Sequence, residues 1–293
     1  MYKISGFGSF YCIIFGHLST EMTIPELVKQ IRSKGSCLCV GLDADMAKLP
    51  QHLLTAPDPV FEFNKQIIDA THEFCVAYKP NTAFYEANGV KGWQSLEKTI
   101  NYITAHYPNH FTIADAKRGD IGNTCHQYAK AFFTNMDFDS VTVAPYMGSD
   151  SVQPFLEYEN KFVILLALTS NKGAFDFQTL KTENGKTVYE NVLKTALSWT
   201  NSERLMFVTG ATQASYLKDI RAIAPNNFFL VPGVGAQGGD LDDVMKNAMN
   251  EQVGLLINSS REIIYASTGT DFAAAAKAKA KEVAEKMKPY ISK

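Results

Sequence analysis

Four charged residues stand at or just beyond the ends of segments that are otherwise apolar. Lys79 ends one such segment, Asp115 and Lys117 lie near the end of another, and Asp120 follows three residues later. In a β-strand, Asp115 and Lys117 would point to the same face, because side chains two residues apart share a face. Aspartate and lysine are seldom buried unless they are paired. The spacing therefore predicts either a structural salt-bridge network or a catalytic array that keeps a lysine and a carboxylate charged beside a substrate.

A second candidate site lies late in the chain, and its residue types suit an anion. Residues 231–240 are rich in glycine, include Gly233, Gly235 and Gln237, and precede a predicted helix. Glycine lets backbone N–H groups approach an anion closely, and the amino terminus of a helix favours negative charge. Arg261 follows the next predicted strand and would add a cationic clamp. We interpret these residues as a phosphate site with Gln237 as a neutral donor.

Eight short apolar segments must position these two groups of residues. Each is followed by a longer stretch with helical periodicity, which is typical of a parallel sheet covered by helices. Eight strands also close a (β/α)8 TIM barrel, whose functional residues lie at the carboxyl ends of the strands. An open doubly wound sheet is the alternative, but residues 41–45 lack its G-x-G-x-x-G turn. The predicted strands are 37–43, 74–79, 111–117, 140–144, 162–168, 205–209, 228–231 and 254–258.

We expect a single α/β barrel domain over residues 22–293. A first amphipathic helix should begin after Met22, with Thr23 as its cap and Pro25 in its first turn. Residues 172–186 form the longest irregular stretch and should be a loop, or a lid, on the active face. Residues 1–21 are expected to be an N-terminal extension that carries no chemistry. Later predicted helices are 57–72, 93–106, 123–133, 150–157, 188–200, 211–223, 240–249 and 272–288.

The composition excludes several classes of protein. The chain has 293 residues, is 46% hydrophobic and carries 28 basic against 30 acidic residues, so it is not a disordered chain or a dedicated nucleic-acid binder. The apolar stretch within residues 10–15 is far below the roughly 20 residues that span a bilayer. Five scattered cysteines indicate a reducing compartment, so we expect a cytoplasmic protein. The cysteines lack zinc-ligand spacing. His106 and His110 stand four apart, but Pro108 between them breaks the helix that a metal pair would need, so we predict no metal.

One run of residues resembles the signature of a known family. Residues 115–124 read DAKRGDIGNT and resemble the D-x-K-x-x-D-I-G-N-T motif of the orotidine 5′-phosphate decarboxylase family. Residues 39–43 resemble the first strand of that family, and residues 232–237 resemble its phosphate loop. Residues 77–86 resemble its longer bacterial branch. The resemblance extends from about residue 36 to residue 267 and so covers most of the chain.

The resemblance implies a TIM barrel that converts orotidine 5′-phosphate to UMP and CO₂, the last step of de novo pyrimidine synthesis, without metal or organic cofactor. It also implies a homodimer whose two active sites are shared between the subunits. Lys117 would then protonate C6 of the pyrimidine, and Asp115 would lie beside the departing carboxylate. Lys79 and Asp120 would complete a Lys-Asp-Lys-Asp array, with Asp120 and Thr124 supplied by the partner subunit.

The physical chemistry agrees with this implied reaction. Direct loss of CO₂ leaves a C6 anion with little resonance stabilisation, and a nearby ammonium attracts it by about 4 kcal/mol at a separation of ~4 Å and an effective dielectric near 20. Charges that are already in place need no reorganisation during the reaction. The other implied contacts are Asp43, Lys79 and Asn81 at the ribose, Ser170 or its neighbour Thr169 at the pyrimidine, and Gln237 and Arg261 at the phosphate.

Three other functions remain as alternatives. Sister barrel families share the D-x-K-x-x-D core but act on sugar phosphates with Mg²⁺, and they carry an extra carboxylate ligand on the second strand. In this sequence Lys79 stands at that place, and its ammonium would repel a metal. A Schiff-base aldolase needs a lysine that loses its proton easily, whereas neighbouring aspartates favour the charged form. A non-catalytic nucleotide-binding barrel is the third alternative. We favour the decarboxylase because every charged position of its array is occupied in this sequence.

Overall fold

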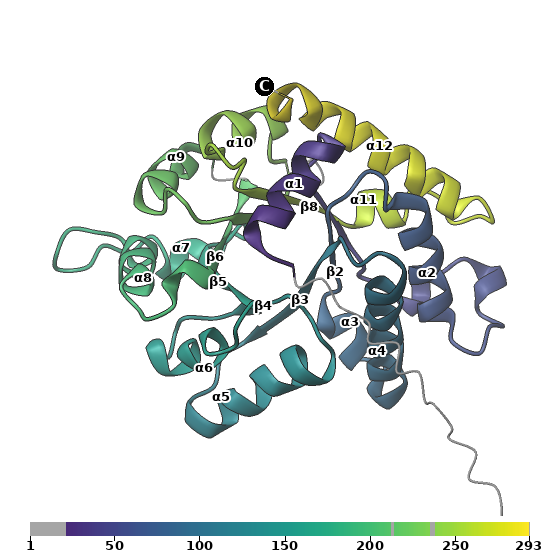
Figure 1. Cartoon of the computed structure of the whole chain (residues 1–293), viewed down its shortest axis with the longest axis horizontal. Helices are drawn as coiled ribbons and strands as arrows, with labels where there is room; N and C mark the ends of the chain where they lie inside the picture. Colours follow the sequence, from purple (N-terminus) through teal and green to yellow (C-terminus); the bar gives the residue numbers. More distant parts are fainter. Residues whose placement is uncertain (1–21, 212–213, 235–237, 293) are drawn as a thin grey trace, which may run out of the picture.

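Eight parallel β-strands form a closed barrel in the computed structural model, which describes residues 22–211, 214–234 and 238–292 (Figure 1). Each strand pairs with the next, and the last pairs with the first. The predicted barrel is therefore confirmed, and the open sheet is excluded. The strands are β1 Leu38–Gly41, β2 Ala77–Lys79, β3 Phe111–Arg118, β4 Ser140–Val143, β5 Phe162–Leu168, β6 Leu205–Thr209, β7 Phe229–Pro232 and β8 Leu255–Ser259.

Helices cover the outside of the barrel, as the periodicity predicts (Figure 1). Among the short helices that the sequence did not predict, α3 and α11 follow β2 and β8 directly. Within the described ranges, no helix has the length and apolar composition that crossing a membrane requires. The helices are α1 Ile24–Lys34, α2 Pro59–Thr71, α3 Thr82–Glu86, α4 Gly89–His106, α5 Gly122–Ala129, α6 Gln153–Leu156, α7 Ala174–Phe177, α8 Val188–Leu197, α9 Ala214–Ile223, α10 Leu241–Ala248, α11 Arg261–Ile264 and α12 Phe272–Ile291.

The first helix, α1, begins and ends as its sequence predicts. The Thr23 hydroxyl accepts a hydrogen bond from the Glu26 N–H, which satisfies one of the unpaired donors at the helix start. The helix ends at Gly35, whose φ of +60° is accessible to glycine at little cost. Leu27 and Ile31, four residues apart, are both buried, so one face of α1 packs into the core.

The segment 172–186 is only partly the irregular loop that we expected. It contains α7, a single turn of helix, and Lys181 pairs with Thr187 in an isolated antiparallel bridge. The helix α8 then starts at a capping box in which Thr187 and Glu190 bond to each other's backbone N–H groups. One helical turn is too short for a 3.6-residue period to show in a sequence, which explains why α7 was missed.

Most residues of the strands are buried, because they face either the barrel interior or the surrounding helices. Lys79 and Asp115 differ from most buried strand residues because they are charged, although they are only 4% and 9% exposed. Both lie toward the carboxyl ends of their strands. Because all the strands are parallel, those ends meet at one mouth of the barrel, which is where barrel enzymes place their sites.

Candidate active site

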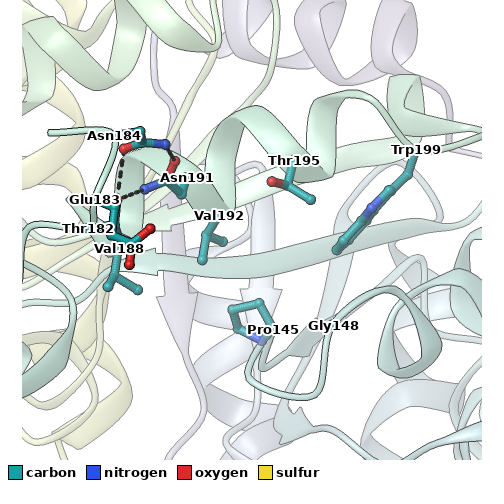
Figure 2. Close-up of a pocket in the computed structure, with 10 residues that line it drawn as sticks. All are labelled: Pro145, Gly148, Thr182, Glu183, Asn184, Val188, Asn191, Val192, Thr195 and Trp199. Atoms are coloured by element: carbon teal, nitrogen blue, oxygen red, sulfur yellow. Dashed lines mark hydrogen bonds between the residues drawn. The ribbon is translucent and has the colours of Figure 1, made fainter. Parts of the chain in front are cut away.

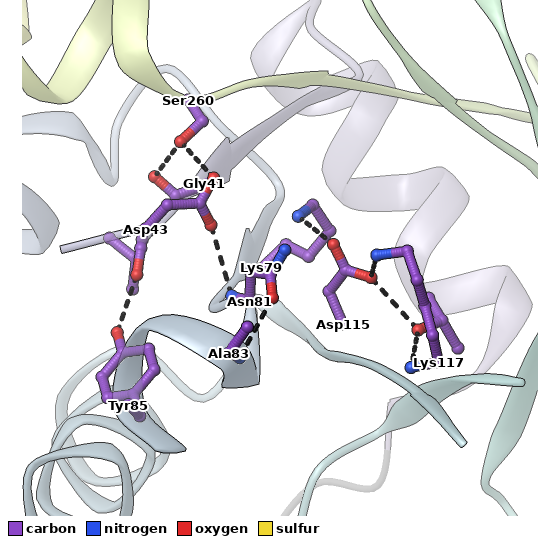
Figure 3. Close-up of polar contacts among 11 residues, drawn as sticks. Gly41, Asp43, Lys79, Asn81, Ala83, Tyr85, Asp115, Lys117 and Ser260 are labelled. Atoms are coloured by element: carbon purple, nitrogen blue, oxygen red, sulfur yellow. Dashed lines mark hydrogen bonds and ion pairs between the residues drawn. The ribbon is translucent and has the colours of Figure 1, made fainter. Parts of the chain in front are cut away.

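Lys79, Asp115 and Lys117 form a continuous chain of ion pairs at the barrel mouth (Figure 3). The Lys79 Nζ lies 2.8 Å from Asp115 Oδ2, and the Lys117 Nζ lies 2.5 Å from Asp115 Oδ1. The structure therefore brings together three members of the predicted four-residue array. One carboxylate between two ammonium groups leaves this ion-pair chain with a surplus of positive charge.

Mutual attraction, rather than burial, sets the protonation of the buried pair. Burial by itself raises the pKa of Asp115, but the charges of Lys79 and Lys117 outweigh it and hold that pKa well below its usual value. Burial also lowers the pKa of Lys79, but the carboxylates of Asp115 and Asp43 outweigh it and hold that pKa above its usual value. Asp115 and Lys79 are therefore both charged at neutral pH.

Lys117 reaches Asp115 through a β-bulge and not through regular strand alternation. The strands β3 and β4 pair at Ala114↔Val141 and next at Arg118↔Val143, which is four residue steps on β3 against two on β4. Lys117 has a φ of +46°, in the left-handed region that residues other than glycine rarely adopt. Its side chain is 51% exposed. The bulge thus aims the Lys117 ammonium along the open mouth, a use of bulges that is common beside active sites.

Asp120 stands apart from the ion-pair chain. Its carboxylate accepts a hydrogen bond of 2.7 Å from the Ile121 N–H, and among the described residues it makes no ion pair with Lys79 or Lys117. Thr124, on α5, is exposed. One chain therefore does not assemble the Lys-Asp-Lys-Asp array by itself. That Asp120 and Thr124 act from a partner subunit stays a prediction.

Asp43 is held at the end of β1 by contacts from two other elements (Figure 3). Its Oδ2 accepts a hydrogen bond of 2.7 Å from the Ser260 hydroxyl, and its Oδ1 accepts one of 3.3 Å from the Asn81 N–H. The Asn81 side chain caps α3 by accepting from the Ala83 N–H. A Cβ on Gly41 would lie 2.6 Å from the Ser260 Cβ, so this close approach requires glycine. The predicted ribose residues Asp43, Lys79 and Asn81 thus lie on adjoining elements.

A cavity of about 320 Å³ lies between the carboxyl ends of β1, β7 and β8. Asp43, Gly233 and Arg261 line it, so three predicted substrate or phosphate residues surround one space. Arg261 is exposed at the first position of α11, and no carboxylate of the described residues forms an ion pair with it. This leaves its guanidinium available to an anion. Gly235 and Gln237, the other predicted phosphate residues, lie outside the described residues.

Ser170 lies just beyond the end of β5, against the end of β6. A Cβ on Gly210 would come within 2.6 Å of the Ser170 Cα, so only glycine permits this packing. The neighbouring Thr169 is engaged with the segment 172–186, since its N–H donates to Gln178 Oε1 at 2.8 Å and its hydroxyl accepts from Gln178 Nε2 at 2.9 Å. The two hydrogen bonds fasten that segment to the end of β5.

A larger cavity, about 580 Å³, lies between α8 and the turn after β4, with Trp199 and Pro145 on its walls (Figure 2). Its polar end is self-contained: Thr182, Asn184 and Asn191 donate hydrogen bonds to one another in a closed ring, each of 2.8 Å. Across the described residues, no three His, Cys, Asp or Glu side chains are grouped to hold a metal ion. The ion-pair chain therefore remains the best candidate for chemistry.

Sequence reasoning missed three residues around the site. Ser260 orients Asp43, Gln178 fastens the segment 172–186, and Lys48 lines the 320 Å³ cavity. Ser260 directly precedes Arg261, which the sequence predicts to bind phosphate. Its position next to that residue could have identified it as part of the site. No sequence pattern could identify Lys48. It belongs to a short 3-10 turn, Met46–Lys48, and it comes close to residues at the end of β8 only when the barrel is closed.

A closed parallel barrel with buried, paired charges at the carboxyl ends of its strands defines a (β/α)8-barrel enzyme. The sequence profile of the "Orotidine 5′-phosphate decarboxylase / HUMPS family" matches residues 36–289. The chain belongs to this family, as the motif at residues 115–124 had indicated.

Individual relatives agree with the family assignment. The chain is 63% identical over 270 residues to orotidine 5′-phosphate decarboxylase of Flavobacterium johnsoniae, covering 92% of this chain and 98% of that protein. Its fold matches the OMP decarboxylase of Leishmania donovani with a TM-score of 0.78 and 37% identity, over 92% of this chain and 99% of that one. It matches the UMP synthase of Leishmania donovani with a TM-score of 0.80 and 38% identity, but spans only 56% of that longer chain.

Proposed function

We propose that this protein is a carboxy-lyase that converts orotidine 5′-phosphate to UMP and CO₂, with no metal or organic cofactor, in pyrimidine biosynthesis. Family membership and the identity to the Flavobacterium decarboxylase support the reaction. The observation that carries the proposal is the position of Asp115 between Lys79 and Lys117. A Mg²⁺-dependent sister enzyme would need a carboxylate where Lys79 lies, and a buried ammonium there opposes a cation.

The proposed step needs only one proton from the protein. The bond between C6 and the carboxylate carbon breaks, CO₂ leaves, and the bonding electron pair stays on C6. The Lys117 ammonium then transfers a proton to C6, which yields UMP and a neutral amine that regains its proton from water. The half-exposed side chain of Lys117 supports this role, because the ammonium is anchored to Asp115 and still faces the open mouth.

The charge distribution favours the anion that forms at C6. Within the ion-pair chain, the Lys117 ammonium is the half-exposed group at the mouth, whereas Asp115 is buried beside Lys79, so a negative charge developing at C6 would face a cation. An ammonium ~4 Å away contributes about 4 kcal/mol at an effective dielectric near 20. Lys79 holds Asp115 in place from its buried side, so little reorganisation accompanies the reaction.

The remote parts of the substrate would bind along the rest of the mouth. The 320 Å³ cavity beside Arg261 and Gly233 is the proposed phosphate site. Gly235 and Gln237 stay predicted phosphate residues outside the described part of the chain. Asp43, Lys79 and Asn81 would hold the ribose hydroxyls, and Ser170 would contact the pyrimidine. Binding energy from the phosphate can then stabilise closure of the segment 172–186 as a lid, which lowers the barrier at the distant C6.

The active site is proposed to be completed in a homodimer. Asp120 and Thr124 lie outside the ion-pair chain of their own subunit, and Ile121 between them is 51% exposed although apolar. A second subunit that covers Ile121 would bring Asp120 to the partner's Lys117. We place the enzyme in the cytoplasm, which agrees with the unpaired state of the four cysteines in the described region.

The direct test follows the loss of pyrimidine absorbance when purified protein meets orotidine 5′-phosphate, with EDTA present. We expect turnover that EDTA does not reduce, and Lys117→Ala should lower kcat by at least about a thousandfold while UMP binding stays measurable. Lys29→Ala, which removes an exposed lysine on α1, is the matched control and should keep full activity. No turnover by the wild-type protein, or full turnover by Lys117→Ala, would contradict the proposal.

A further inference from the structure

A single hydroxyl, that of Thr142, connects the two residues at the centre of the site. Thr142 lies on β4, is 1% exposed and stands opposite the bulge of β3. Its Oγ1 accepts a hydrogen bond of 2.9 Å from the Lys117 backbone N–H and donates one of 3.2 Å to Asp115 Oδ1. The hydroxyl therefore uses its donor and one of its acceptor positions within the site.

The bulge creates the need for this hydroxyl. Where β3 carries two extra residues, regular pairing with β4 stops after Ala114 and resumes only at Arg118. A backbone N–H left inside this gap without a partner would be costly. Thr142 supplies the partner from its side chain. This bond accompanies the left-handed backbone of Lys117, a conformation that persists only when the surroundings hold it.

The same hydroxyl also acts on the opposite end of the Lys117 side chain. Asp115 Oδ1, which accepts from Thr142, is the oxygen that pairs with the Lys117 Nζ at 2.5 Å. Thr142 thus fixes the backbone atom where the lysine begins and the carboxylate oxygen where its ammonium ends. Because threonine is β-branched, its χ1 angle is restricted and the hydroxyl direction is fixed with it.

We propose that Thr142 is a positioning residue for the proton donor Lys117. The proposal rests on the proposed decarboxylation, and it assigns Thr142 no contact with the substrate. Without the hydroxyl, the Lys117 backbone would lose its anchor in the bulge, and the ammonium would spend less time where C6 needs a proton. In the described part of the chain, the hydrogen bonds of the Thr142 hydroxyl go to Lys117 and Asp115 and not to the proposed phosphate and ribose residues Arg261, Asp43, Lys79 and Asn81, so phosphate and ribose binding should not change.

Two comparisons isolate the effect of the hydroxyl: the wild type against Thr142→Val, and Thr142→Ser against Thr142→Ala. Thr142→Val replaces it by a methyl group of similar size, and Thr142→Ser differs from Thr142→Ala only in keeping it. We expect Thr142→Val and Thr142→Ala to lower kcat by about tenfold or more, because both hydrogen bonds of the hydroxyl are lost, one of them to a charged carboxylate. Thr142→Ser should stay within about threefold of the wild type. KM and the dissociation constant of UMP should remain unchanged in all three.

A second threonine separates positioning from general destabilisation. Thr99 on α4 is also fully buried, and its hydroxyl bonds to Ser95 and Asn64 outside the site. Thr99→Val should lower the melting temperature without lowering kcat. Should Thr142→Val fail to fold, the serine–alanine pair still decides the matter.

Three results would overturn the role of Thr142: wild-type kcat in Thr142→Val, equal losses in the serine and alanine variants, or a loss confined to KM. In each case an active wild-type protein would leave the proposed function standing. If the wild-type protein does not decarboxylate orotidine 5′-phosphate, the proposed function is wrong and the role of Thr142 falls with it.

Discussion

At the scale of single residues, the feature that needs explaining is a buried charge cluster in an apolar barrel. Removing Lys79 and Asp115 from water is costly, and their short mutual contact, the second contact with Lys117 and the hydrogen bond from Thr142 compensate for it. Such a cluster is weak evidence for stability, since well-packed apolar residues often do as well. We attribute its presence at the mouth of the barrel to the proposed decarboxylation, which needs charges held in place there.

The same contacts make stability depend on pH. The pKa of Asp115 is lower in the folded protein than in the unfolded chain, so its contribution is present above about pH 4 and is lost as the pH falls through the folded value. We expect the free energy of unfolding to decrease as the pH falls below about 4. Asp115→Asn should flatten this dependence. It should also destabilise the protein by about 3–5 kcal/mol at pH 7, because Lys79 is left buried and unpaired.

Urea denaturation at a series of pH values measures both effects. Asp137→Asn is the control, because Asp137 also forms an ion pair with a lysine but is 55% exposed. This control should change stability by less than about 1 kcal/mol. An Asp115→Asn variant with the stability and pH dependence of the wild type would show that the ion-pair chain is not tightly formed.

At the scale of elements, irregularity gathers at the carboxyl ends of the strands. The register shifts in β3–β4 and in β5–β6 both lie toward that end, and the segment 172–186 is attached there. Regular pairing continues through the amino-terminal halves of these strands. The barrel is therefore a regular scaffold that carries a deformed rim, and the deformations aim functional side chains.

Gln178 offers a test of the segment 172–186 as a lid. Gln178→Ala removes both hydrogen bonds to Thr169 and should loosen the attachment of the segment to β5. We expect kcat/KM for orotidine 5′-phosphate to fall by about tenfold, because lid closure over the substrate becomes less favourable. The neighbouring Thr179→Ala serves as control, since its hydroxyl bonds to the carbonyl of Phe175 within the same segment and not to β5. Equal kinetics for the two variants, measured at steady state, would remove the lid from the mechanism.

At the scale of the whole molecule, one chain leaves the array incomplete. Asp120 lies apart from Lys117 in its own subunit, so the fourth charge must come from elsewhere if it acts at all. A homodimer with two-fold symmetry places the same residue of each subunit in the other's site. Catalysis would then belong to the dimer, and neither chain would be active alone.

Mixing two inactive variants tests this arrangement. Lys117→Ala and Asp120→Asn should each lose most activity as pure dimers. In a mixed dimer, one site would carry both changes and the other neither, so a statistical mixture should recover about a quarter of wild-type turnover. Activity is followed after the two proteins are unfolded and refolded together. If Asp120 serves its own subunit, the mixture stays inactive.

Local patterns in the sequence were sufficient for the architecture. Eight apolar segments, each followed by a helical period, predicted the order of the strands and the closed barrel, because burial on both faces of a parallel sheet imposes that pattern. The motif at residues 115–124 was sufficient for the family. The sequence did not predict short helices such as α7 and α11, because four residues are too few to show a helical period.

What the tertiary structure alone decided is how the charges are paired. Sequence spacing put Asp115 and Lys117 on one face, but the contact is made through a bulge that forms only when β4 lies alongside β3. The same spacing grouped Asp120 with them, and the turn after β3 carries it away. The sequence by itself determined the charges available and the fold that gathers them. Their partners were decided by the folded chain, because pairing depends on burial and on contacts between segments far apart in the sequence.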